Sequence, residues 1–203
     1  EVIGGDGGNI FELILGADSS KDKIISREFY SDKAVDLSSS VTALAVGNSY
    51  MLAGNAAGLS DTKANDLFET DNWKYHGKLS NEGIADISFD EYDDYFNTVL
   101  KNGYVGVLDA MTQDAEWPTP VCIAHKGGGQ CLVNATATSI SEYKGSHHIL
   151  VVGGGNDDKH TFISDSRDSN TWNKIDISDT SKLNKIRCFG DSQNSQCLAV
   201  GDN

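Results

Sequence analysis

A short apolar segment that ends in glycine recurs along the chain about every 50 residues, and this period limits the folds available. Residues 44–47 and 198–201 both have the sequence Leu-Ala-Val-Gly, and residues 98–103 and 150–153 are related to them. The glycines that close the four segments are Gly47, Gly103, Gly153 and Gly201. They are 56, 50 and 48 residues apart, and joining the two chain ends gives 49 for the last interval. A regular period of this length indicates a fold built from repeated units.

Each repeat has the pattern of several short β-strands. Apolar runs such as residues 10–15 and 104–108 are bounded by Gly, Asn and Asp, which is the pattern of strands joined by tight turns. The chain contains 21 Gly but only 2 Pro, and its 38% hydrophobic content is typical of a folded protein. We therefore expect an all-β fold with four strands in each of four repeats.

Four-stranded sheets of this kind must stack to bury both of their faces, and a ring of sheets leaves only short edges exposed. We therefore predict a single β-propeller domain over residues 1–203, with four blades of about 50 residues. The strand at 197–201 is expected to complete a blade whose other strands come from the N-terminal segment. A β-sandwich or barrel is one alternative, although neither needs a 50-residue period. A fragment of a larger ring is another, and the near-equal last interval argues against it.

Residues 164–172 resemble the Asp-box, or BNR repeat, of sialidase-like propellers. The anchor positions of that motif are Ser166, Asp168, Thr171 and Trp172. Polar residues stand where the family usually has glycine, and an eroded second copy lies at 69–73. The resemblance implies a structural motif on the outer perimeter of a blade, with the Trp packed under a hairpin. It therefore indicates a scaffold and not a reaction.

The three arginines of the chain argue against sialidase activity. By family resemblance, a sialidase needs three arginines that converge on a substrate carboxylate. This chain has only Arg27, Arg167 and Arg187, and Arg167 falls within the Asp-box turn, where it is expected to face the perimeter. We assign no catalytic residue. A glycoside hydrolase or lyase that uses two carboxylates in the central funnel remains the alternative.

No metal or other cofactor is predicted. The acidic residues 90–94 lie in an expected turn between strands, where carboxylates are solvated. Calcium is the alternative there, but the glycine that bends a calcium-binding loop is absent. His147 and His148 are adjacent in an expected strand that we place innermost in its blade, so they point to opposite faces and cannot chelate one ion.

The net charge of −14 would repel polyanions, so nucleic acid and anionic membranes are poor partners. No apolar run approaches the roughly 20 residues needed to cross a bilayer. The chain begins with Glu1, as a processed secreted protein would. We expect a secreted or extracellular protein, with the cell surface or the periplasm as alternatives.

The cysteines and one asparagine fit the same location. Two cysteine pairs have identical spacing, Cys122 with Cys131 and Cys188 with Cys197, which favours disulfides although other connectivities stay open. Asn134 begins a glycosylation sequon.

These features favour a secreted, non-catalytic binding module that recognises carbohydrate or an extracellular protein. Its candidate contacts are the aromatic residues Trp117, Tyr75 and Tyr104. An acidic scaffold that holds a basic partner is a further alternative. The sequence leaves the oligomeric state open.

Overall fold

The computed structural model describes residues 2–4, 9–14, 23–28, 40–56, 58–63, 74–77, 83–91, 93–109, 121–122, 135–143, 146–154, 161–166, 171–177, 182–190 and 193–202. Every regular element among them is a β-strand, which confirms the all-β prediction. No helix in these ranges is both long and apolar enough to span a bilayer.

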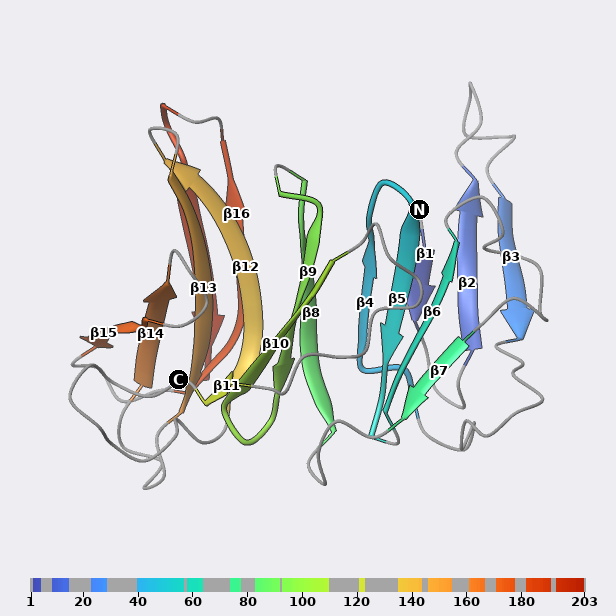
Figure 1. Ribbon diagram of the computed structural model, residues 1–203, viewed down its shortest axis with the longest axis horizontal. Coiled ribbons are helices and arrows are strands. Elements are labelled where there is room, and N and C mark those ends of the chain that lie inside the picture. Colours follow the sequence, from blue (N-terminus) through green and yellow to red (C-terminus); the bar gives the residue numbers. More distant parts are fainter. Residues whose placement is uncertain are drawn as a thin grey trace.

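The strands form five antiparallel sheets (Figure 1). Sheet 1 contains β1 (Val2–Gly4), β2 (Asn9–Ile14) and β3 (Lys23–Glu28). Sheet 2 contains β4 (Ala43–Val46), β5 (Tyr50–Gly54), β6 (Leu59–Lys63) and β7 (Lys74–Gly77). Sheet 3 contains β8 (Ile84–Asp90), β9 (Tyr95–Leu100), β10 (Tyr104–Asp109) and β11 (Val121–Cys122). Sheet 4 contains β12 (Ala135–Tyr143), β13 (Ser146–Gly154), β14 (Thr161–Ser166) and β15 (Asn173–Ile177), and sheet 5 contains β16 (Leu183–Phe189) and β17 (Gln196–Gly201).

The five sheets stack in sequence order. Within each sheet, strands that are neighbours in sequence pair with one another. The first strand of each sheet, which we call its inner strand, packs against the inner strand of the next: β1 against β4, β4 against β8, β8 against β12, and β12 against β16. Successive sheets that meet along their first strands are the arrangement of propeller blades.

The core lies between the sheets. The cluster between sheets 2 and 3 consists of Ala43, Leu52, Leu59, Ile84, Ile87, Phe96 and Leu100. The cluster between sheets 3 and 4 consists of Val99, Val105, Ala135, Ile149, Val151 and Trp172. The cluster between sheets 4 and 5 consists of Ala137, Val152 and Ile186. Sheets 3 and 4 are therefore covered on both faces.

A one-residue irregularity recurs near the start of the inner strands. The pairing shifts between Ile84 and Asp86 in β8, and the same shift follows Ala135 in β12 and Leu183 in β16. In β12 the hydroxyl of Thr136 lies within hydrogen-bond distance of the Val152 carbonyl of its own sheet and of the Leu183 carbonyl of the next. This position in the bulge thus links adjacent sheets.

The predicted glycine repeat is out of phase in the first unit. Gly153 and Gly201 lie at or near the end of the second strand of their sheets, and Gly103 follows such a strand, whereas Gly47 follows an inner strand. Gly54, which ends β5, occupies the place expected for Gly47. The predicted equivalence of Gly47 and Gly201 is wrong. The two segments have the same sequence, but β4 is the first strand of sheet 2 and β17 is the second strand of sheet 5. A Cβ at Gly47 would lie 2.7 Å from both the Phe89 and Phe96 rings.

The predicted closed ring is not confirmed. Sheets 1 and 5 are separate, and within the described chain β17 pairs only with β16, so the N- and C-terminal segments do not share a blade. Figure 1 shows sheet 1 at one end of the stack and sheets 4 and 5 at the other. The physical reason is that β16 supplies the partner of β17, and Ile186 anchors this hairpin on sheet 4. The described residues form five sheets, so the prediction of four blades is not confirmed.

Candidate functional site

Two adjoining hollows lie across the inner strands, and we call them together the inner-strand groove. The first has a volume of about 290 Å³ and is lined by Val46, Phe89, Glu91, Ile140, Ser141, Glu142, Cys188, Phe189, Gly190 and Ser195. The second has a volume of about 300 Å³ and is lined by Ala45, Val46, Ile87, Ser88, Phe89, Thr138, Ser139, Ile140, Arg187 and Cys188. Sheets 2 to 5 all contribute, so the groove exists only because these sheets stack.

The groove combines exposed apolar side chains with a few charges. Val46 at the end of β4 is 46% exposed, and Phe189 at the end of β16 is 57% exposed. Phe89 also lines the groove and packs against the Phe96 ring, with centroids 4.9 Å apart and an interplanar angle of 45°. Exposed apolar surface in a concavity is typical of a binding site.

Asp86 forms a polar link beside the groove. Its side chain is only 3% exposed and accepts a hydrogen bond from the Thr138 amide at 3.1 Å. Lys185 Nζ and Arg187 Nη1 each lie 3.3 Å from one of its two oxygens. Because the partners come from sheets 4 and 5, this carboxylate of sheet 3 connects three consecutive sheets.

Arg187 is held in place while it lines the second hollow. Its Nη1 also donates to the carbonyls of Thr138 and Ile186, at 3.2 Å and 2.8 Å. These contacts orient the guanidinium, which can then offer a positive group to a ligand in the groove. The groove therefore presents one positioned cation among apolar side chains.

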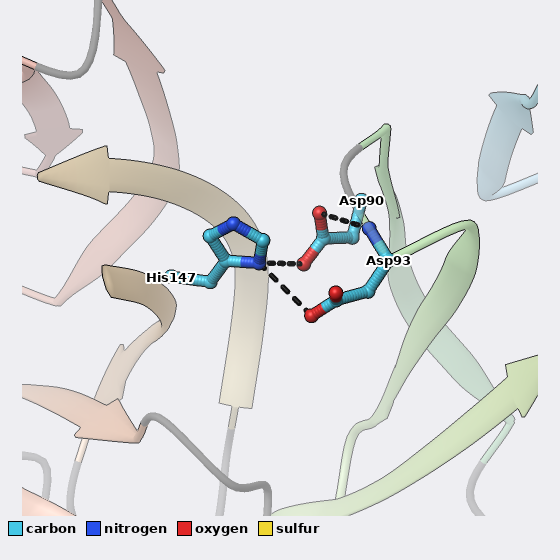
Figure 2. A group of neighbouring side chains, drawn as sticks. All are labelled: Asp90, Asp93 and His147. Atoms are coloured by element: carbon cyan, nitrogen blue, oxygen red, sulfur yellow. Dashed lines mark hydrogen bonds and ion pairs between the residues drawn. The ribbon is translucent and has the colours of Figure 1, made fainter. Parts of the chain in front are cut away.

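A second cluster gathers Asp90, Asp93 and His147 (Figure 2). His147 Nδ1 lies 2.9 Å from Asp93 Oδ2 and 3.5 Å from Asp90 Oδ2. The Asp93 amide donates to the other oxygen of Asp90 at 3.4 Å. One ligand atom from each residue lies within 4.8 Å of the others, and carboxylate and imidazole groups together suit Zn²⁺ or Mn²⁺. Without an ion, His147 Nδ1 and Asp93 Oδ2 are within hydrogen-bond distance of each other.

This cluster differs from the prediction made for its residues. The acidic turn was expected to be solvated. Glu91 and Asp93 are exposed as expected, whereas Asp90, the last residue of β8, is buried. His147 lies on β13, the second strand of sheet 4, and not on an inner strand. Sequence reasoning missed the contact because it compared His147 only with His148, whereas the carboxylates come from the neighbouring sheet.

Of the predicted aromatic contacts, only the side chain of Tyr104 lies within the described part of the chain. Tyr104 is half-buried against the core between sheets 2 and 3, and it is not among the described residues that line the groove. The backbone of Tyr75 pairs with Ser60, and its side chain is not described. Trp117 lies outside the described residues.

The Asp-box remains a prediction, although one of its residues has the expected environment. Trp172 is buried in the core between sheets 3 and 4, and Thr171 before it is exposed. Ser166 ends β14, and Asp168 lies outside the described residues.

The disulfide between Cys188 and Cys197 is confirmed and joins directly paired positions of β16 and β17. Cys122 lies in β11, whereas its predicted partner Cys131 and the predicted glycosylation site Asn134 lie outside the described residues.

Comparison with known proteins identifies the fold and no family. No protein-family profile and no curated protein matches the sequence. The chain is similar in structure to the β-propeller domain of Cps50 (Swd1) from Myceliophteria thermophila, with a TM-score of 0.60, 8% identity and 92% of this chain covered. It is also similar to the computationally designed protein Ika8, with a TM-score of 0.54, 17% identity and 98% covered. The chain spans 58% and 51% of those two chains, so it has the β-propeller fold but only about half their length.

Proposed function

We propose that this chain is a non-catalytic binding module that holds a segment of a protein partner in the inner-strand groove. The observation that carries the proposal is the exposure of Val46 and Phe189 in hollows whose other walls are packed inner strands. Burying these side chains under a partner stabilises a complex by the hydrophobic effect, in the range of about 1.5–3 kcal/mol for each fully covered side chain.

The charges of the groove indicate what such a segment contains. Arg187 is the positioned cation of the second hollow, so it favours an acidic side chain or a chain terminus of the partner. Glu91 and Glu142 line the first hollow and favour a basic group there. A ligand with apolar side chains flanked by one acidic and one basic group matches this distribution.

Carbohydrate is the second candidate ligand, because Glu91 and Glu142 line one hollow together with Phe89. Carboxylates beside an aromatic face are typical of sugar-binding sites. A glycoside hydrolase needs two carboxylates, and Glu91 and Glu142 are the two that line this hollow. We also propose that the protein is extracellular. The Cys188–Cys197 disulfide supports this, because disulfides persist in oxidising surroundings.

A peptide selection tests the proposal. A displayed random peptide library would be selected on the immobilised full chain, and the affinity of the enriched peptides measured by calorimetry. Phe189→Ser is expected to weaken binding at least tenfold, because it removes the largest exposed apolar contact of the groove. Tyr95→Ser is the matched control, since Tyr95 is an exposed aromatic residue that does not line either hollow.

Two results would contradict the protein-binding proposal. One is an equal loss of affinity in both variants. The other is a glycan array that gives ligands when the peptide library gives none. If a bound glycan is also cleaved, and Glu91→Gln or Glu142→Gln abolishes the cleavage without loss of folding, the hydrolase alternative replaces the binding module.

A further inference from the structure

Asp90, Asp93 and His147 form a contact between sheets 3 and 4, and we call these three residues the sheet-bridging cluster (Figure 2). Asp90 ends β8, and Asp93 lies in the turn before β9. His147 is the second residue of β13, 54 residues after Asp93. None of the three lines either hollow of the inner-strand groove. The cluster therefore plays no part in the peptide binding proposed above.

The distances in the cluster are those between ligands of one metal ion. His147 Nδ1 lies 2.9 Å from Asp93 Oδ2 and 3.5 Å from Asp90 Oδ2. An ion with bonds of about 2.0–2.2 Å to nitrogen and oxygen holds neighbouring ligand atoms about 3.0–3.5 Å apart. Figure 2 shows an oxygen of each carboxylate directed toward the same ring nitrogen. A metal ion could therefore contact all three residues after only small movements of their side chains.

The burial of the cluster differs from one residue to the next. The side chain of Asp90 is 6% exposed, and its Oδ1 accepts a hydrogen bond from the Asp93 amide at 3.4 Å. This bond orients the carboxylate so that Oδ2 faces His147. The side chain of Asp93 is 58% exposed and leaves the cluster open to solvent on that side. The cluster thus has one fixed ligand and a path by which an ion can enter.

The charges of the cluster also favour a divalent cation. Its two carboxylates lie within 4.8 Å of each other, and one of them is buried, so an opposite charge between them is needed. A protonated His147 would cancel one negative charge. A divalent ion would cancel both, with the neutral imidazole as its third ligand. The net charge of −14 further raises the concentration of cations near the protein.

We propose that the sheet-bridging cluster binds one divalent transition-metal ion, with Zn²⁺ preferred, through Asp90 Oδ2, Asp93 Oδ2 and His147 Nδ1. The imidazole distinguishes this cluster from an ordinary acidic turn, because Ca²⁺ takes about six to eight oxygen ligands whereas imidazole suits Zn²⁺. Zn²⁺ also binds a given set of ligands more tightly than Mn²⁺ does. Solvent would complete the coordination, and the bound ion would join sheets 3 and 4.

Calorimetric titration of Zn²⁺ into the full chain, freed of metal with a chelator, tests the proposal. His147→Gln and Asp90→Asn are each expected to weaken Zn²⁺ binding at least tenfold, because each removes a ligand. The matched controls His148→Gln and Asp94→Asn should change the affinity little. His148 points to the opposite face of β13, and Asp94 accepts a hydrogen bond from Asn48 instead.

Thermal unfolding gives a second measurement. Saturating Zn²⁺ should raise the melting temperature of the wild type and of both controls, but not that of His147→Gln. Circular dichroism would show that each variant is folded. His147→Gln is the safer test in this respect, because His147 is less buried than Asp90.

Three results would overturn the metal site. These are a wild type that does not bind Zn²⁺, equal Zn²⁺ affinity in the folded His147→Gln and His148→Gln variants, and Ca²⁺ binding as tight as Zn²⁺ binding. The peptide selection in the groove can be run with a chelator present, so its outcome is independent of the metal. The two proposals therefore fail separately.

Discussion

Asp86 is a residue on which polar contacts from two other sheets converge. Its carboxylate is buried, whereas Lys185 and Arg187 keep about half of their side-chain surface in water. The cost of burying the carboxylate is offset by the Thr138 amide and by two cations, either of which can remain when the other is removed. Asp86 thus has two positive partners, and one of them remains when the other is removed.

This redundancy predicts a non-additive double-mutant cycle. Lys185→Gln and Arg187→Gln should each lower the free energy of unfolding by about 1 kcal/mol or less, as for partly exposed ion pairs. The double variant should cost clearly more than their sum, about 3 kcal/mol in total, because the buried carboxylate then has no cation. Urea denaturation would measure all four proteins, and strict additivity would contradict the redundancy.

Asn97 on β9 is a polar residue in an apolar position. It corresponds by register to Leu150 in sheet 4 and is almost fully buried. Neither atom of its side-chain amide has a hydrogen-bond partner among the described residues. An unpaired buried polar group costs about 1–3 kcal/mol.

Asn97→Leu is therefore expected to raise the free energy of unfolding by about 1–2 kcal/mol, because Leu has a similar size and no polar group to leave unpaired. Asn55→Leu is the matched control. Asn55 is also buried, but its side chain accepts a hydrogen bond from the Gly58 amide at 3.0 Å, so this change should destabilise the protein. Thermal melts of the two variants should move in opposite directions, and a shift of both to lower temperature would count against the assignment.

The sequence predicted that these segments are strands, and the order of the strands along the chain, better than it predicted the place of each strand within its sheet. Glycine- and asparagine-bounded apolar runs located most inner and second strands, and both kinds of strand share this pattern. That similarity is also why residues 44–47 were matched to residues 198–201, although one is an inner strand and the other a second strand. Only the pairing register distinguishes them, and register depends on contacts distant in sequence.

Gly54 ends β5 and lies close to the next sheet. A Cβ there would lie 2.7 Å and 2.8 Å from Cγ2 and Cβ of Ile84 in the next sheet. Gly54→Ala should lower the free energy of unfolding by about 1–3 kcal/mol, because sheets 2 and 3 must move apart.

Gly106→Ala provides the comparison for this variant, since its added Cβ would meet only the Thr98 hydroxyl, at 3.0 Å. Its cost should be smaller in the same denaturation experiment. Equal stability of the two variants would show that the close approach at Gly54 is not what constrains this position.

The whole molecule is a row of sheets in which close packing joins each sheet to its neighbours. The repeat in the sequence predicted such stacking, because a 50-residue period of strands has few other solutions. It did not predict that the first and last described sheets are separate, since a period in the sequence does not reveal which sheets contact one another. The Asp90–His147 contact was unpredictable for a related reason, because it depends on how two stacked sheets are aligned.

Such a row predicts a gradient of local stability along the chain. Stability in stacked repeats is close to a sum of nearest-neighbour terms, so units covered on both faces open less often. Amide hydrogen exchange should be slowest in β9 and β13 and faster in β17. Mass spectrometry of exchanged peptides would measure this at low protein concentration, and uniform protection of all three strands would argue against the nearest-neighbour description.

The two tasks of Arg187 imply a competition. The guanidinium that an acidic guest would meet in the second hollow is also one of the two cations beside Asp86. A ligand carboxylate that attracts Arg187 weakens the contact between Arg187 and Asp86. Lys185 is then the remaining cation beside the buried Asp86. The affinity for acidic ligands is therefore reduced by the loss of the Arg187–Asp86 contact between sheets 5 and 3. Ligands that bind Arg187 more tightly should loosen the hairpin of β16 and β17.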